Sequence, residues 1–259
     1  MTTSKERGVL DLSGRRALVT GASRGIGAAI ARLLASAGAD VMIAYRTRGD
    51  EAAAVETDAR RAGVRACSHA ADVATASGAE DLVSATVREL GGVDIFVANA
   101  GIWPEEEIAL AAMSAERWHQ TVRQNLDSVF HTTAAVTRHM SDGGRIVLIS
   151  STAGQRGEAF HADYAATKGA VISITKSLAV ELAPRGITVN CVAPGWVDTE
   201  MVAGAISSKG LDRISHGIPL GRIATPDDIA GPVAFLCSAL ARHITGEILN
   251  VNGGSVLCG

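Results

Sequence analysis

Tyr164 and Lys168 are the two side chains of this sequence whose types and spacing point most directly to chemistry. They are four residues apart, so in a helix they lie one turn apart on the same face. An ammonium group beside a phenol favours the phenolate and lowers a pKa that is ordinarily near 10. The spacing therefore predicts a pair that donates or accepts a proton at neutral pH, as a general acid or base.

Ser151 is the third candidate for chemistry, because it follows the apolar run 145–150, which has the length of a buried strand. Open parallel sheets bind ligands beyond the carboxyl ends of their strands, so a hydroxyl at this position would face a bound molecule. We expect it to hydrogen-bond a carbonyl oxygen. Taken singly, a serine after a strand is usually a cap and a Tyr-x-x-x-Lys pair is usually exposed, so the assignment depends on a binding site beside them.

Such a site is predicted by the glycine-rich turn at residues 20–27 (TGASRGIG), which joins a short apolar run to an amphipathic helix. Glycines let the backbone approach a pyrophosphate, which free N–H groups and the positive end of the helix then bind. Three residues separate Gly21 from Gly25, so the spacing differs from GxGxxG. An ordinary strand-to-helix turn is the weaker interpretation. The residues expected to contact a dinucleotide here are Gly21, Ser23, Arg24, Gly25, Ile26 and Gly27.

The end of the second expected strand, at Tyr45 and Arg46, favours NADP(H) over NAD(H). An NAD site would carry an acidic residue there to bind the ribose 2′-hydroxyl, whereas Asp40 lies at the opposite end of the strand. Arg24 and Arg46 can hold a 2′-phosphate through charge-assisted hydrogen bonds, with Arg48 as a substitute. Solvated surface arginines are the alternative, and NAD(H) remains the second choice of cofactor.

Short apolar runs alternate with longer helical stretches along the whole chain. Such alternation predicts parallel pairing with right-handed crossovers. The expected fold is one doubly wound Rossmann-type α/β domain over residues 1–259, with a mostly parallel seven-stranded sheet and helices on both faces. Strands are expected at 16–20, 41–45, 94–98, 145–150, 187–192 and 248–251, with a weaker one at 65–69. Helices are expected around the apolar repeat Ile30, Leu33, Leu34 and Ala37, and at 50–62, 76–90, 114–139, 162–182 and 226–238.

The composition is that of a globular protein. Of 259 residues, 47% are hydrophobic and 20% charged, which is enough apolar side chain to form a full core. A formal net charge of -3 gives no overall basic field, so neither nucleic acid nor an anionic membrane surface is expected as a partner. The longest stretch without Asp, Glu, Lys or Arg, 229–241, is shorter than the roughly 18 residues of a membrane span.

The cysteines and histidines predict reduced thiols and no metal centre. Cys67, Cys191, Cys237 and Cys258 are too widely spaced for a CxxC pair, and residues 1–16 lack the apolar segment of a secretory signal. A cytoplasmic location is therefore expected. The seven histidines form no HxH or HExxH motif and no pairing with cysteine, so no catalytic metal is expected.

These motifs, in this order, closely resemble the short-chain dehydrogenase/reductase family, in the branch that carries TGxxxGIG near the N-terminus and YxxxK near the middle. The resemblance spans residues 10 to 255. One position departs from it, because the family's usual NNAG begins here with Ala98. The matches beyond the turn and the catalytic candidates are Asp72-Val73, Asn99-Ala100-Gly101, Asn125, Pro194-Gly195 and Asn252-Gly253-Gly254.

The resemblance implies a role for each matching residue. Tyr164 would act as the acid in reduction and the base in oxidation, and Lys168 would lower its pKa and hold the nicotinamide ribose. Ser151 would orient the substrate oxygen. Asn125 would anchor a water that relays protons from Lys168 to solvent, the alternative being a helix-interior amide that satisfies a backbone group. Besides Tyr45 and Arg46, the implied cofactor contacts are Asp72 and Val73 at adenine, Asn99, Ala100 and Gly101 at ribose, and Pro194, Gly195, Val197 and Thr199 around nicotinamide.

The substrate is open between two classes of enzyme. The chain resembles 3-oxoacyl-(acyl-carrier-protein) reductases, but Asp142 stands where these often have a basic residue, while Arg185 keeps a basic position elsewhere. Acyl carrier protein is thus the weaker candidate partner beside a small ketone or alcohol. The alternative is a secondary alcohol dehydrogenase or a carbonyl reductase of secondary or xenobiotic metabolism. A cofactor-binding regulator without turnover is the third class, and the presence of Tyr164 and Lys168 argues against it.

Residues 198–219 carry spaced apolar side chains where the family has a mobile substrate lid, which can exclude water during hydride transfer. An ordinary packed surface helix is the other interpretation. Trp103 and His161 are candidate substrate contacts, with plain loop residues as the alternative, and Glu105–Glu107 is most simply a solvated loop. The family resemblance implies a homotetramer, and a dimer also fits.

Overall fold

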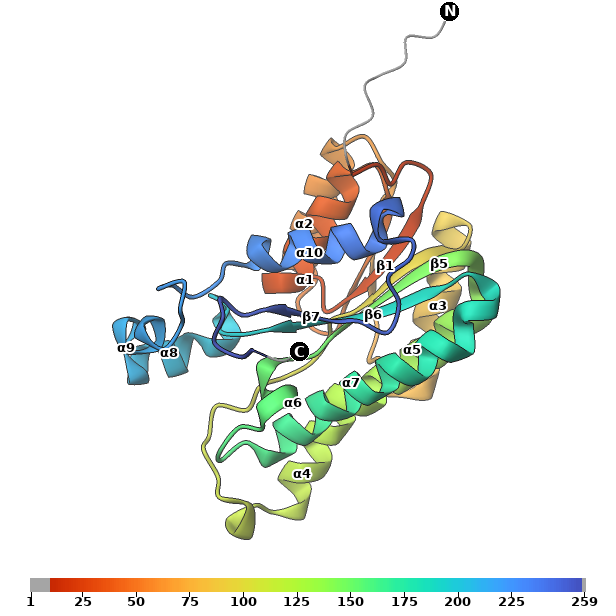
Figure 1. Ribbon diagram of the computed structural model, residues 1–259. Helices are drawn as coiled ribbons and strands as arrows, with labels where there is room; N and C mark the ends of the chain where they lie inside the picture. The colour runs from red at the N-terminus through yellow and green to blue at the C-terminus, as the bar shows by residue number, and fades with distance from the viewer. Residues whose placement is uncertain (1–9, 258–259) are drawn as a thin grey trace, which may run out of the picture.

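The computed structural model describes residues 10–257 and has a seven-stranded sheet at its centre (Figure 1). The strand order is β3-β2-β1-β4-β5-β6-β7, and each neighbouring pair is parallel. The order reverses between β1 and β4, so the expected doubly wound Rossmann-type sheet is confirmed. Cys258 and residues 1–9 lie outside the described range. The strands are β1 (Arg16–Thr20), β2 (Asp40–Tyr45), β3 (Ala66–Ala70), β4 (Val93–Ala98), β5 (Met140–Ile149), β6 (Thr188–Pro194) and β7 (Ile248–Val251).

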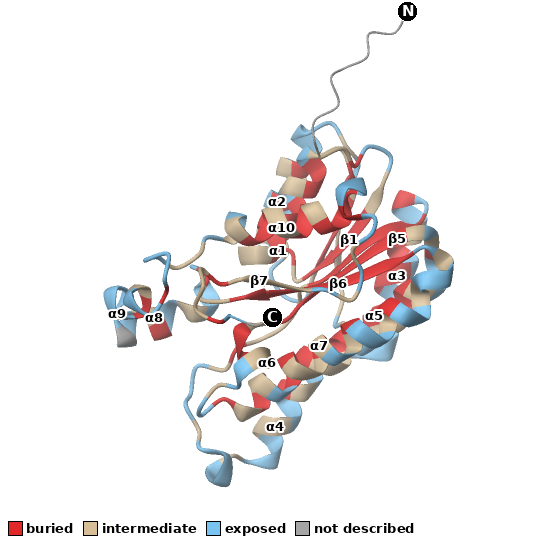
Figure 2. Cartoon of the chain, in the orientation of Figure 1, coloured by how far each residue is buried: buried red, intermediate tan, exposed pale blue. Residues whose placement is uncertain are grey.

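Helices cover both faces of this sheet (Figure 1). Helices α1, α2 and α10 pack on one face, and α3, α5 and α7 pack on the other. Each layer buries aliphatic side chains, and buried residues, drawn red in Figure 2, are concentrated in the sheet and on the helix faces that pack against it. Every residue of β4 is buried, as expected for a central parallel strand. The helices are α1 (Gly25–Ser36), α2 (Gly49–Arg61), α3 (Ala76–Leu90), α4 (Ala115–Val122), α5 (Ser128–His139), α6 (Thr152–Arg156), α7 (Ala162–Leu182), α8 (Ala203–Lys209), α9 (Leu211–His216) and α10 (Pro226–Cys237).

The expected helix 114–139 is interrupted by one wider turn. The π-helical turn η2 (Arg123–Asp127) lies between α4 and α5, and Asn125 at its centre is fully buried. Single π-turns are frequent at functional sites because the wider turn re-aims nearby side chains. The expectation of one continuous helix over 114–139 did not include this turn.

Strand β5 begins five residues before its predicted start at Arg145. Met140 pairs with Val93, and the register then shifts before Arg145 pairs with Ile95. The intervening residues 141–144 (SDGG) are polar or glycine, so they lack the apolar run from which a strand is predicted.

The loops at the carboxyl ends of the strands converge along one edge of the sheet. The β1–α1 turn, the loops after β2, β3 and β4, the β5–α6 connection and the segment after β6 all contribute to this edge. The segment after β6 contains the 3-10 turn η4 (Glu200–Val202) and leads into α8 and α9. Within residues 10–257, every helix is too short or insufficiently apolar to span a bilayer.

Candidate active site

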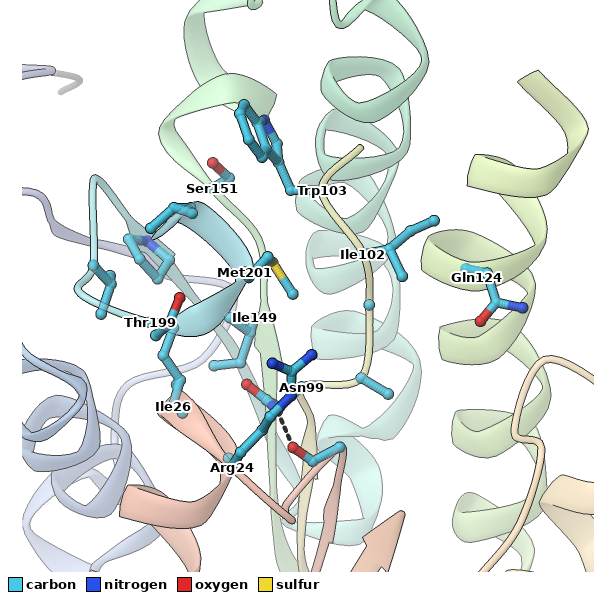
Figure 3. A pocket seen from close by; sticks show the side chains of 18 of the residues that line it. Arg24, Ile26, Asn99, Ile102, Trp103, Gln124, Ile149, Ser151, Thr199 and Met201 are labelled. Carbon is cyan, nitrogen blue, oxygen red and sulfur yellow. Dashed lines mark hydrogen bonds between the residues drawn. The ribbon is translucent and has the colours of Figure 1, made fainter. Parts of the chain in front are cut away.

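A pocket of about 590 Å³ opens at this edge of the sheet, as Figure 3 shows from close by. Trp103 and Ser151 lie toward one end of the view and Arg24 toward the other, with Met201 between them. Every cofactor and catalytic residue predicted from the sequence lines this pocket except Asn125. The predicted set, although spread over 179 positions from Gly21 to Thr199, is thus brought together by the fold.

The β1–α1 turn forms a backbone cradle at the floor of the pocket. A Cβ atom on Gly27 would lie 2.3 Å from the Gly21 carbonyl oxygen, and one on Gly21 would lie 2.9 Å from the Ala100 Cα. Gly21 also has φ +63°, a left-handed conformation that favours glycine. Helix α1 begins after Arg24 without a side-chain cap, so its first N–H groups are available to an anion. The cradle therefore fits a pyrophosphate.

Thr20 holds this cradle in place, a role that the sequence reasoning missed. Its hydroxyl accepts hydrogen bonds from the backbone N–H groups of Asn99 and Ala100, at 3.0 and 3.1 Å. The Asn99 side-chain amide in turn donates to the carbonyl oxygens of Thr20 and Gly21, at 3.0 and 3.1 Å. Asn99 lines the pocket, as expected, but its amide nitrogen is bonded to the turn.

Three guanidinium groups gather on the pocket beyond the ends of β1 and β2. Arg24, Arg46 and Arg48 all line it. Arg46 Nη1 donates to Gln124 Oε1 at 2.6 Å, and Arg24 Nη1 lies 2.5 Å from Glu200 Oε2. Neither acceptor was predicted, because Gln124 and Glu200 belong to no motif in the sequence.

The three catalytic candidates meet at the other part of the pocket. Ser151 caps α6, where its hydroxyl oxygen accepts a hydrogen bond from the Ala153 N–H at 3.1 Å, and the same hydroxyl acts to lower the pKa of Tyr164. Tyr164 and Lys168 lie on α7, with Lys168 Nζ 5.7 Å from the centre of the Tyr164 ring. Lys168 Nζ donates to the Ile149 carbonyl oxygen at 2.9 Å. Ser151 is thus both a helix cap and part of the site.

The pKa of Tyr164 differs from the sequence prediction. Burial raises this pKa to about 12, although the hydrogen bond with Ser151 acts in the opposite direction. Burial also lowers the pKa of Lys168 to about 8. The direction of the Tyr164 shift is opposite to the lowering predicted from the sequence, because burial outweighs the effect of the Ser151 hydroxyl. At neutral pH the site holds a neutral phenol beside an ammonium group.

Asn125 is the predicted site residue that does not line the pocket. Its amide oxygen accepts from the Ile102 N–H at 2.7 Å, and its amide nitrogen donates to the Ile102 carbonyl oxygen at 2.9 Å. A longer bond joins the same nitrogen to the Thr167 hydroxyl at 3.4 Å. The Asn125 side chain thus joins η2 to the loop after β4. This agrees with the alternative interpretation, in which the amide satisfies backbone groups. The water relay implied by the family stays a prediction.

Asp163, which the sequence reasoning missed, fixes the start of the catalytic helix. Its carboxylate is fully buried and accepts hydrogen bonds from the Thr121 hydroxyl at 2.7 Å and from Arg117 Nε at 2.8 Å. Burial raises the pKa of Asp163, but these two bonds and the charge of Arg117 outweigh it and hold the pKa below its usual range. Asp163 thus ties α7 to α4 directly beside Tyr164.

Replacing Asp163 with asparagine is expected to destabilise the fold by about 3 kcal/mol at neutral pH, because Arg117 loses its buried counter-charge. The pKa of Asp163 is lower in the folded chain, so its stabilising effect is complete above its unfolded pKa, about 3.9, and is lost as the pH falls through the lowered value. Urea denaturation across pH should show the difference from wild type shrinking below about pH 4.

The matched control for this variant is Glu106→Gln, which makes the same acid-to-amide change at an exposed partner of Arg117. We expect it to change the free energy of unfolding by less than about 0.5 kcal/mol. Equal small losses in the two variants would show that the Asp163 ion pair does not hold α7 in place.

Aromatic side chains form one wall of the pocket. Trp103 and Trp196 both line it, with their ring centres 6.1 Å apart and the rings inclined at 70°. His161 stacks on Trp103, with the ring centres 4.8 Å apart, and is 1% exposed, so it packs behind Trp103 and does not line the pocket.

Of the expected lid, only Asp198–Val202 is among the lining residues. Within residues 10–257, no group of three His, Cys, Asp or Glu residues is arranged to hold a metal ion.

Known proteins are similar to this chain in sequence and in fold over almost its whole length. The family model described as enoyl-(acyl carrier protein) reductase matches residues 21–255. The 3-oxoacyl-(acyl-carrier-protein) reductase FabG of Aquifex aeolicus (strain VF5) is 42% identical over 252 residues, covering 95% of this chain and 98% of that protein. Cyclohexanol dehydrogenase of Rhodococcus sp. (strain TK6) is 40% identical over 262 residues, covering 95% and 97%.

Among solved structures, a blue fluorescent protein from a metagenomic library, in complex with NADPH, superimposes with a TM-score of 0.89. It is 37% identical, and the match covers 95% of this chain and 100% of that one. Sequence identity and fold thus agree with the motifs that line the pocket. The chain belongs to the short-chain dehydrogenase/reductase family of oxidoreductases.

Proposed function

We propose that this protein uses NADP(H) to interconvert a ketone and a secondary alcohol, with a 3-oxoacyl thioester or a related ketone as substrate. The observation that carries the proposal is the meeting of Ser151, Tyr164 and Lys168 in the pocket that also contains the glycine cradle. The relatives named 3-oxoacyl-(acyl-carrier-protein) reductase support the substrate class.

The pocket offers groups that suit both charged parts of the cofactor. The cradle formed by Gly21 and Gly27 suits the pyrophosphate, and the three arginines beyond β1 and β2 suit a 2′-phosphate. Strand β2 ends at Tyr45, with no acidic residue to bind a 2′-hydroxyl. When bound, the nicotinamide would supply the hydride that reduces the carbonyl carbon. The NADPH-bound structural neighbour supports this choice of cofactor.

Tyr164, Ser151 and Lys168 have separate roles in transferring the proton and orienting the substrate. In reduction, the Tyr164 hydroxyl donates its proton to the substrate oxygen, and its raised pKa keeps that proton available at neutral pH. The Ser151 hydroxyl donates a hydrogen bond to the same oxygen and orients it. Lys168 places a positive charge beside the phenolate that remains, because its own pKa of about 8 leaves it largely protonated at pH 7. In oxidation, the phenolate form of Tyr164 accepts the proton, so Tyr164 must first lose its own proton and the oxidative direction is favoured as the pH rises.

The surface near β5 does not favour docking of an acyl carrier protein. Arg185 Nε is bonded to Asp142 at 2.9 Å, and its other nitrogens donate to the carbonyl oxygens of Thr137 and Met140. This guanidinium is therefore already engaged by acceptors of its own chain. The proposed substrate is accordingly a small ketone or thioester rather than a carrier-bound chain.

Oxidation of a secondary alcohol is the second candidate function. The aromatic wall formed by Trp103 and Trp196 suits an apolar ring, and one relative at 40% identity is named cyclohexanol dehydrogenase. A cofactor-binding regulator without turnover is disfavoured, because all three catalytic side chains are present and face one pocket.

A substrate panel tests these functions against one another. NADPH oxidation, followed by absorbance, is measured with β-ketoacyl thioesters, β-ketoesters, diketones and cyclic ketones, and NADP⁺ reduction with the matching alcohols. Selective turnover of thioesters supports the proposal, and turnover confined to cyclic ketones or alcohols supports the second candidate. Tight NADPH binding without turnover of any compound would favour the regulator.

The cofactor preference is tested by replacing Arg24 and Arg46 with alanine together. We expect NADPH affinity to fall about a hundredfold and NADH affinity to change less than about threefold, because charge-assisted bonds to a 2′-phosphate contribute roughly 1.5–3 kcal/mol each. Fluorescence titration of both cofactors measures this. Equal losses for the two cofactors would show that these arginines do not bind the 2′-phosphate.

We also propose a homotetramer in the cytoplasm. Phe130 on α5 and Val180 on α7 are 60% and 77% exposed, although both are large apolar side chains. Their exposure supports burial against another copy of the chain. Cys67, Cys191 and Cys237 are free thiols, which suits a reducing compartment.

A further inference from the structure

Glu200 carries a negative charge into the group of arginines on the pocket. It lies in η4, and its Oε2 atom is 2.5 Å from Arg24 Nη1 and 3.5 Å from Arg48 Nη2. Arg24 immediately precedes α1, and Arg48 immediately precedes α2. All three residues line the pocket. One carboxylate therefore connects the segment after β6 to the starts of two helices.

This carboxylate lies on the donors that a 2′-phosphate would need. A guanidinium group binds carboxylates and phosphates through the same fork of N–H donors, so both anions compete for Arg24. A phosphate monoester carries about 1.5 to 2 negative charges at neutral pH and is repelled by a carboxylate at the same place. The 2′-hydroxyl of NAD(H) carries no charge, so it is not repelled by Glu200 and does not compete with it for Arg24.

We infer that Glu200 is a residue that determines cofactor specificity: it weakens NADPH binding selectively and so narrows the pocket's preference for NADPH over NADH. The inference rests on the proposed use of NADP(H), and it assigns to Glu200 a role opposite to that of Arg24. The Glu200 side chain is 62% exposed and that of Arg24 39% exposed, so water screens the pair. The expected effect is therefore moderate, a change of about three- to tenfold in affinity.

Glu200→Gln removes the charge while keeping the size of the side chain. In fluorescence titrations of the purified full chain, we expect this variant to bind NADPH about three- to tenfold more tightly than wild type and NADH equally well, within about 1.5-fold. The gain should shrink in 0.5 M salt, because ions screen exposed charges. Since Glu200 is exposed, the substitution leaves the core intact, and thermal melting checks this.

Glu51→Gln provides the matched control. Glu51 lies on α2, its Oε1 atom is 2.8 Å from Arg48 Nη1, and it is not among the lining residues of the pocket. The control makes the same change of charge at a shared arginine, but from outside the pocket and from another element. We expect it to change NADPH affinity by less than twofold.

Three results would overturn the inference. They are unchanged NADPH affinity in Glu200→Gln, weaker NADPH binding in that variant, and equal gains in Glu200→Gln and Glu51→Gln. Failure of the proposed cofactor choice has a different signature: wild type would then bind NADPH and NADH equally, and Arg24→Ala would not alter their ratio. The two failures are thus separable within one set of titrations.

Discussion

Replacing Tyr164 with phenylalanine is expected to lower turnover by at least about a hundredfold, because general acid catalysis contributes roughly 10²- to 10⁴-fold. The change removes one oxygen atom and leaves the ring, so NADPH affinity should stay within about twofold of wild type. The kcat for the ketone selected by the substrate panel and the Kd of NADPH from fluorescence titration measure the two effects separately. The loss should appear in kcat as well as in kcat/KM.

Tyr45→Phe is the matched control for this prediction. Tyr45 is the other tyrosine of the chain, and it lines the same pocket from the end of β2. Tyr45 is a predicted cofactor contact at the end of β2, so removing its hydroxyl is expected to act on NADPH affinity, whereas kcat at saturating NADPH should stay within about threefold of wild type. Undiminished turnover in Tyr164→Phe would remove Tyr164 from the mechanism.

Gly27→Ala is expected to weaken NADPH binding by at least about tenfold and to destabilise the fold by about 1–3 kcal/mol. The added Cβ would lie 2.3 Å from the Gly21 carbonyl oxygen and 2.6 Å from the Asn99 amide nitrogen. Both atoms belong to the cradle, so the backbone must move just where a pyrophosphate would contact it. Fluorescence titration with NADPH and urea denaturation measure the two losses.

Gly231→Ala makes the same substitution inside another helix. Apart from its two chain neighbours and the backbone of α10 itself, no heavy atom of residues 10–257 lies within 4 Å of the Cβ that it would add to α10. Alanine favours helix over glycine by about 1 kcal/mol, but its Cβ is crowded by the ring of Pro232, the next residue. The free energy of unfolding of this variant is therefore expected to lie within about 1 kcal/mol of wild type, with NADPH affinity unchanged. If Gly27→Ala binds NADPH as tightly as Gly231→Ala does, the close approach at Gly27 is not what shapes the site.

The strands and most of the helices could be predicted because their apolar residues repeat with the period of the structure they form. The sequence pattern predicts a helix over 162–182, and α7 spans those residues, with Tyr164 and Lys168 on one face as their spacing requires. Local signals of this kind depend on neighbours in the sequence. They located the glycine turn, the catalytic pair and the carboxyl edge of the sheet.

Contacts between distant segments left no such signal. Asp163 is bonded to Thr121 and Arg117, which precede it by 42 and 46 residues, and none of the three belongs to a motif. Glu200 reaches Arg24 across 176 residues. The raised pKa of Tyr164 left no signal for the same reason, because the burial that raises it comes from the packed domain and not from the three residues between Tyr164 and Lys168.

The hydrogen bonds between Thr20 and Asn99 make the shape of the glycine turn depend on a segment far along the chain. They connect residues 79 positions apart, so the loop between them must close before the glycine turn is held in shape. The sequence TGASRGIG is complete at residue 27, but a nascent chain lacks the fixed cradle until β4 has been made and has paired with β1. Dinucleotide binding in this fold therefore depends on a long-range contact and not on the TGASRGIG segment alone.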